Sequence, residues 1–172
     1  MITGLYFGSF NPIHIGHLAI ANFMVEFSDL EQLWFVVSPQ NPLKEKKSLL
    51  QDYHRLEMVR LAIEDDDRFK ASDIEFKLPT PSYTIDTLTY LEEKHPGREF
   101  QLVMGGDGLR TFHKWKHADL IVQKYHRLIY PRPGTDQEAA LQIPNATLVD
   151  APRMGISSSF IRQAIKEGKD VR

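Results

Sequence analysis

The sequence contains no cysteine among its 172 residues. This absence excludes disulfides, cysteine nucleophiles and thiolate zinc sites, and we expect a cytoplasmic protein because nothing requires an oxidising compartment. A basic, apolar leader and any uninterrupted apolar run of about 18 residues are also missing, so we expect neither a signal peptide nor a membrane span. Excess positive charge is absent too: the formal net charge is −2, which argues against nucleic acid as a partner.

What is present is the composition of a folded α/β protein, with 42% hydrophobic and 26% charged residues. The length fits one domain over residues 1–172. Apolar runs predict strands over residues 2–7, 33–37, 100–104, 127–130 and 147–149. Helical spacing predicts helices at about residues 14–25, 52–63, 84–91 and 157–166. This alternation predicts a Rossmann-like, doubly wound parallel sheet.

The ends of these helices carry capping signals. Asp52 is a candidate N-cap of the second helix, and Ser82 or Thr84 of the third. In the last helix we expect Ile161, Ala164 and Ile165 to face the core. Gly168 is expected just beyond its C-terminus, where glycine commonly ends a helix.

The loop after the first predicted strand has the features of a phosphate site. Gly8 permits close approach of the backbone, and the helix that begins near residues 14–16 directs free N–H groups toward an anion. His14 and His17 lie three residues apart, so both imidazoles could donate hydrogen bonds to a polyphosphate. By spacing alone, the same pair could bind a metal or only cap the helix. Neither a Walker A lysine pattern nor the three-glycine dinucleotide motif occurs.

Two segments resemble the signatures of a known superfamily. Gly8-Ser9-Phe10-Asn11-Pro12 followed by His14-Ile15-Gly16-His17 is similar to the N-terminal signature of the nucleotidylyltransferases, and Ile156-Ser157-Ser158-Ser159-Phe160-Ile161-Arg162 is similar to their C-terminal motif. The second segment is also an anion site by its chemistry, because a hydroxyl-rich helix N-terminus precedes a permanently charged arginine. Standing alone, its serines would be ordinary caps and Arg162 a solvated residue.

The middle of the chain resembles bacterial nicotinate mononucleotide adenylyltransferases, and the resemblance covers essentially all 172 residues. It implies transfer of the adenylyl group of ATP to nicotinate mononucleotide, with Mg²⁺ held mainly by the ATP phosphates and with no dedicated metal site in the protein. The implied catalytic residues are His14, His17, Arg162 and Lys44. The implied ATP-binding residues are Gly8, Ser9, Phe10, His17, Gly105, Asp107, Ile156, Ser157 and Arg162. The implied acceptor-binding residues are Ser82, Tyr83, Thr84, Trp115 and Arg132.

Several alternatives stay open at this point. Lys44 lies beside Lys46 and Lys47 in a loop that could simply be solvated, and Trp115 could be a core residue. A phosphopantetheine adenylyltransferase would share both phosphate motifs, and a non-catalytic nucleotide-binding module could share the fold. The family normally has a further helix after the segment matching Gly168, and Gly108 replaces a more usual polar residue. The sequence leaves homo-oligomerisation open.

Overall fold

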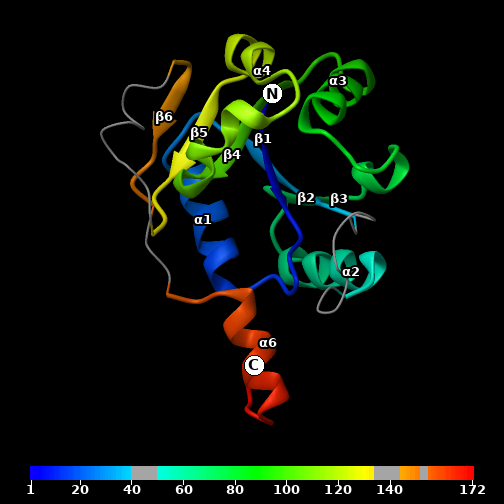
Figure 1. Ribbon diagram of the computed structural model, residues 1–172, viewed down its shortest axis with the longest axis vertical. Helices are drawn as coiled ribbons and strands as arrows, with labels where there is room; N and C mark the ends of the chain where they lie inside the picture. The colour runs from blue at the N-terminus through cyan, green and yellow to red at the C-terminus, as the bar shows by residue number, and fades with distance from the viewer. Residues whose placement is uncertain (40–49, 134–143, 152–154) are drawn as a thin grey trace.

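The computed structural model of the chain describes residues 1–39, 50–133, 144–151 and 155–172. At its centre is a six-stranded sheet with the order β3-β2-β1-β4-β5-β6, and every pair of neighbouring strands is parallel (Figure 1). The strands are β1 (Ile2–Gly8), β2 (Gln32–Val37), β3 (Phe69–Ser72), β4 (Glu99–Gly105), β5 (Arg127–Tyr130) and β6 (Ala146–Leu148). The helices are α1 (Ile15–Glu26), α2 (Asp52–Ile63), α3 (Thr84–Lys94), α4 (Ala118–Lys124) and α6 (Ser158–Lys166), with 3₁₀ turns η1 (Ile74–Lys77), η2 (Gly106–Arg110) and η3 (Phe112–Lys114).

Two apolar layers lie on the two faces of the sheet. On one face, α1 and α2 contribute Met24 and Val59 to the core, and on the other, α3 and α4 contribute Leu88 and Ile121. Successive residues of a strand point to opposite faces, and Leu5 and Tyr6 of β1 accordingly join different layers. The sheet is buried on both faces, which explains why its strands read as continuous apolar runs.

The predicted fold class and the five predicted strands are confirmed, with strand ends shifted by at most one residue. The sequence reasoning missed β3 and α4. Strand β3 has four residues, with Lys70 and Ser72 at alternate positions, and it lies at an edge of the sheet. Helix α4 has seven residues, which is too short to show a clear helical period.

Three expectations about helix ends and faces were wrong. Gln51 precedes α2 as its N-cap residue, and Asp52 instead pairs with Arg55. Tyr83, and not Ser82 or Thr84, occupies the N-cap position of α3, and its side chain makes no capping hydrogen bond. Ile165 of α6 is 56% exposed, whereas Ala164 is buried as expected.

The expected glycine end of α6 is confirmed. Gly168 has a φ of 72°, in the left-handed region that glycine favours. The Gly168 N–H donates to the Ile165 carbonyl at 3.0 Å and the Lys169 N–H donates to the Ala164 carbonyl at 2.9 Å, which is the Schellman pattern. No helix within the described ranges is long and apolar enough to cross a membrane.

The strand order reverses between β1 and β4. From β1 the chain moves outward through β2 and β3, and it then returns to pair β4 with the other side of β1. In sheets of this kind, ligands bind beyond the carboxyl ends of the strands at such a reversal. The segments that follow Gly8 and Gly105 are therefore the first places to look for a site.

Candidate active site

The loop after β1 is built over a buried phenylalanine. Phe10 is 2% exposed, although its φ of 48° lies in the left-handed region. A Cβ atom added at Gly8 would lie 3.0 Å from the Phe10 ring, so the glycine makes room for this side chain. The Phe10 ring in turn meets the His17 ring edge to face, with 5.0 Å between the centroids. Packing below the loop thus determines where the histidine lies.

His14 and His17 cap the N-terminus of α1 reciprocally. His14 is the N-cap residue, and its Nδ1 accepts a hydrogen bond from the Gly16 N–H at 3.1 Å. His17 Nδ1 accepts from the His14 N–H at 3.1 Å, which completes a capping box. The two rings stack with centroids 3.8 Å apart. Because each Nδ1 accepts, the neutral form of each ring carries its proton on Nε2.

Both imidazoles are held in the neutral form. Burial lowers the pKa of His17 to about 3, with further contributions from His14 and Arg132. Burial, followed by the Arg132 charge, also lowers the pKa of His14. Neither Nε2 has a hydrogen-bond partner among the described residues. The loop therefore presents two N–H donors and not two fixed positive charges.

The second predicted motif packs against the first. Ser158 Oγ donates to the Pro12 carbonyl at 2.8 Å, and Arg162 Nη1 donates to the Asn11 carbonyl at 2.8 Å. Ser157 caps α6 by accepting from the Phe160 N–H at 3.1 Å. In Figure 1 the N-terminal end of α6 accordingly meets the body of the molecule beside the loop after β1. Two segments that lie far apart in the sequence thus form one surface.

The third part of the site lies at the carboxyl ends of β4 and β5. Arg132 Nε lies 3.5 Å from Asp107 Oδ2, and both side chains are about half exposed. Burial opposes the charge of Arg132, but Asp107 and the Tyr130 hydroxyl raise its pKa on balance. A Cβ atom at Gly105 would come within 2.6 Å of both Arg132 Cδ and Asp107 Oδ1. Only glycine leaves room for this pair as it stands.

The predicted acceptor residues come from the start of α3, from the segment after η3 and from the segment after β5. Tyr83, beside Ser82 and Thr84 at the start of α3, lies under the Lys116 ammonium at 4.9 Å from its ring centroid. Lys116 also pairs with Asp86 at 3.2 Å, so α3 and the segment after η3 are neighbours. Arg132 belongs instead to the group at β4 and β5.

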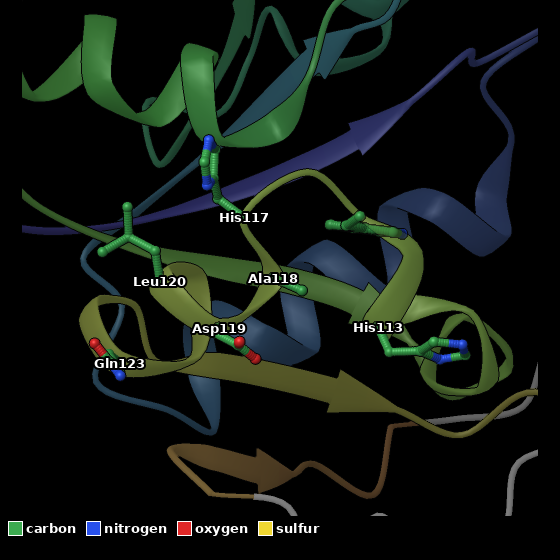
Figure 2. A pocket seen from close by; sticks show the side chains of 7 residues that line it. His113, His117, Ala118, Asp119, Leu120 and Gln123 are labelled. Atoms are coloured by element: carbon green, nitrogen blue, oxygen red, sulfur yellow. The ribbon is translucent and has the colours of Figure 1, made fainter.

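Trp115 is half-buried and packs on Phe112, with 4.8 Å between the ring centroids. It also lines an open cavity of about 490 Å³. The remaining lining residues come from η3, from α4 and from the N-cap position before α4 (Figure 2): His113, His117, Ala118, Asp119, Leu120 and Gln123. Trp115 thus combines a core contact with a free surface.

Three further predicted site residues are Lys44, Ser9 and Ile156. Lys44 lies outside the described residues. Ser9 is exposed immediately after β1, and Ile156 is 38% exposed just before α6. Within the described part of the chain, no three His, Asp or Glu side chains gather into a group that could hold a metal ion.

Sequence reasoning missed three side chains beneath the site. The hydroxyls of Tyr6 and Tyr130 lie 3.3 Å apart, and burial raises the pKa of Tyr6 above its ordinary value. Arg55 is fully buried and donates to the Ser9 carbonyl at 2.7 Å. The sequence could have indicated the burial of Arg55, because this residue lies four residues before Val59 on the apolar stripe of α2.

The chain matches a family model described as cytidylyltransferase-like over residues 5–164. A relative from Flavobacterium johnsoniae, described as a probable nicotinate-nucleotide adenylyltransferase, is 53% identical, and the match covers 100% of this chain and 90% of the relative. A relative of the same description from Bacteroides fragilis is 49% identical, with 99% and 85% covered.

Solved structures share the fold. The Plasmodium falciparum nicotinic acid mononucleotide adenylyltransferase, in complex with APC, superposes with a TM-score of 0.79 at 21% identity, covering 99% of this chain and 86% of that one. A structure described as a putative nicotinate-nucleotide adenylyltransferase from Vibrio parahaemolyticus gives 0.73 at 22% identity, covering 98% and 89%.

Proposed function

Because the chain belongs to the nicotinate-nucleotide adenylyltransferases of the cytidylyltransferase-like family, we propose that it adenylylates nicotinate mononucleotide in NAD biosynthesis. A phosphate oxygen of the acceptor attacks the α-phosphorus of ATP, the bond to the β-phosphate oxygen breaks, and pyrophosphate leaves. The product is nicotinate adenine dinucleotide. No covalent intermediate is required, because such transfers are driven by positioning and by stabilisation of charge.

The observation that carries this proposal is the junction of the two phosphate motifs. The capping box of α1 leaves two Nε2–H donors available, and Arg162 lies against the same loop, bonded to the Asn11 carbonyl. Its guanidinium has five N–H donors, and two are engaged with protein oxygens. Donors that are already in place stabilise charge that develops in the transition state.

In this mechanism His14, His17 and Arg162 bind the triphosphate and stabilise the negative charge that moves onto the leaving pyrophosphate. Lys44 is assigned the same role on the family resemblance alone. A neutral imidazole can perform this task, because its Nε2–H donates to a phosphate oxygen without the ring first having to be protonated. Burial of the ring strengthens such a bond relative to one in water.

The nucleoside of ATP is assigned to the carboxyl ends of β1 and β4. Asp107 accepts hydrogen bonds from the ribose hydroxyls once its partner Arg132 turns to the acceptor phosphate. The full set proposed to bind ATP is Gly8, Ser9, Phe10, His17, Gly105, Asp107, Ile156, Ser157 and Arg162.

The acceptor is assigned to the start of α3 and to the segments that follow η3 and β5. Tyr83 is the N-cap residue of α3 and makes no side-chain capping hydrogen bond, and the N–H groups of the first turn, which starts at Thr84, are assigned to the nicotinate carboxylate. Trp115 offers a face for the pyridine ring, Arg132 binds the phosphate, and Ser82 completes the set.

Mg²⁺ is the proposed cofactor, bound by the phosphates of ATP and by water. This assignment rests on the family resemblance, because the phosphates of ATP and water can supply the oxygen ligands that Mg²⁺ prefers. When bound, the ion neutralises part of the triphosphate charge. We also propose that the protein acts in the cytoplasm.

The test is to incubate the purified chain with ATP, Mg²⁺ and one acceptor at a time, and to measure pyrophosphate and dinucleotide. Nicotinate mononucleotide should support the highest kcat/KM. A higher kcat/KM with phosphopantetheine would identify the chain as a phosphopantetheine adenylyltransferase instead. ATP binding without pyrophosphate release from any acceptor would identify a non-catalytic module.

A further inference from the structure

Arg55 is a charged residue in a place where the helix pattern calls for an apolar one. It lies on the buried side of α2 with Leu56 and Val59, and its side chain is 0% exposed. Burial lowers the pKa of its guanidinium, against the opposing effect of Asp52. A buried charge is costly to the folded state, and apolar residues of similar size often replace such groups without loss of stability. Stability alone therefore explains Arg55 poorly.

The guanidinium joins three separate segments of the chain. Nη1 donates to the Ser9 carbonyl at 2.7 Å and to the Ser38 carbonyl at 2.7 Å, and Nε donates to the Leu50 carbonyl at 2.9 Å. Ser9 belongs to the loop after β1, Ser38 follows β2, and Leu50 precedes α2. The remaining nitrogen, Nη2, pairs with Asp52, whose side chain is 32% exposed.

Other hydrogen bonds tie the same segments together around this group. The Ser38 N–H donates to the Gly8 carbonyl at 2.8 Å, and the Leu50 N–H donates to Asn11 Oδ1 at 3.1 Å. Asn11 is the residue whose carbonyl receives Arg162. The contacts of Arg55 thus extend, through one loop, to the group proposed to bind the triphosphate.

We propose that Arg55 is a positioning residue for ATP: its fork of donors fixes the backbone of the loop after β1 in the conformation that binds the triphosphate. This role rests on the proposed function and adds a residue to it. Arg55 itself does not touch the substrate. A lysine keeps the charge but is a single point donor, which cannot reproduce the planar fork that spans three carbonyls.

The chain supplies a matched control in Arg127. This second arginine is 1% exposed, and burial lowers its pKa as well. It lies at the amino end of β5, where Nη2 donates to the Pro144 carbonyl at 2.9 Å and the guanidinium covers the Phe112 ring at 4.5 Å. None of these contacts involves the loop after β1. Arg127→Lys therefore measures what the loss of a buried arginine remote from that loop does to stability and to ATP binding.

The experiment compares Arg55→Lys and Arg127→Lys with the unaltered chain. Thermal unfolding gives stability, calorimetric titration with ATP and Mg²⁺ gives the dissociation constant, and steady-state rates well below each melting temperature give kcat and both KM values. We expect both variants to lose stability. Only Arg55→Lys should weaken ATP binding, by about tenfold or more, while its KM for the acceptor stays within about twofold.

Equal effects of the two variants on ATP binding, or tight ATP binding by a folded Arg55→Lys, would overturn the proposal. Arg55→Gln removes the buried charge and serves as a second variant, with the same expected loss of ATP affinity. Failure of both Arg55 variants to fold, while Arg127→Lys folds, would assign Arg55 a structural role and also overturn it. If the unaltered chain makes no dinucleotide, the proposed function fails, but the ATP titrations still decide the role of Arg55.

Discussion

His17 performs two tasks with its two ring nitrogens, and substitutions can separate them. Nδ1 accepts from the His14 N–H as part of the helix cap, and Nε2–H is the donor assigned to the triphosphate. Asparagine places its amide oxygen near the position of Nδ1 and has no atom near Nε2. His17→Asn should therefore keep the cap and lose the donor, whereas His17→Ala should lose both.

The expected magnitudes differ enough to be measured apart. Loss of one preorganised donor costs roughly 100-fold to 1,000-fold in kcat, and loss of a helix cap costs about 1 kcal/mol of stability. We expect kcat to fall by at least about 100-fold in both variants, with little change in the dissociation constant of ATP. Only His17→Ala should lower the free energy of unfolding, measured by urea titration. An unchanged rate of adenylyl transfer in His17→Asn, with chemistry rate-limiting, would refute the role of Nε2.

Four further predictions follow from the same geometry. Trp115→Ala should weaken acceptor binding by about 1 to 3 kcal/mol with ATP binding unchanged; calorimetry showing equal losses for both ligands would indicate a core role. Gly105→Ala should reduce kcat/KM about tenfold or more, because the added Cβ displaces Arg132 and Asp107. Gly97→Ala, which has open space around the added Cβ, should leave kcat/KM unchanged. Similar kcat/KM values in the two variants would contradict the role of Gly105. The pKa of His17 is about 3 in the folded chain against an ordinary 6.5, so between these values the unfolded chain binds a proton that the folded chain does not. The free energy of unfolding should therefore fall as pH drops below about 6.5, at up to ~1.4 kcal/mol per pH unit. Urea titrations that give His17→Asn the same dependence on pH would exclude His17 as its source. Nicotinate mononucleotide should exceed nicotinamide mononucleotide by at least about tenfold in kcat/KM, because an amide presents a donor to the N–H groups of α3; equal efficiencies in parallel assays would remove the carboxylate site from α3.

The sequence predicted the fold well because its strands are buried on both faces. The resulting apolar runs, such as residues 33–37, are distinct from the helical spacing between them. Strand β3 was not predicted, because polar and apolar residues alternate along its four positions at the edge of the sheet. Helix ends were less predictable: Asp52 is a residue type that often caps helices, but α2 begins at Asp52 itself, and its carboxylate pairs with Arg55 one turn further along the same helix.

The candidate site was predictable where its residues form short motifs. The two phosphate motifs were identified from local sequence, and the structure shows them in contact through Arg162 and Asn11. Arg55 carries no such motif, because three of its four hydrogen-bond partners are backbone carbonyls, which any residue could supply. The hydroxyl contact between Tyr6 and Tyr130 likewise joins positions 124 residues apart that only the strand order brings together.

The most direct test of the proposed reaction follows the α-phosphorus of ATP. The chain is incubated with nicotinate mononucleotide, Mg²⁺ and ATP labelled at the α-phosphorus, and the products are separated and identified by mass. The proposed reaction places all transferred label in nicotinate adenine dinucleotide, in equal amount to unlabelled pyrophosphate. Label in free AMP alone, or a dinucleotide that never forms while ATP is consumed, would contradict it.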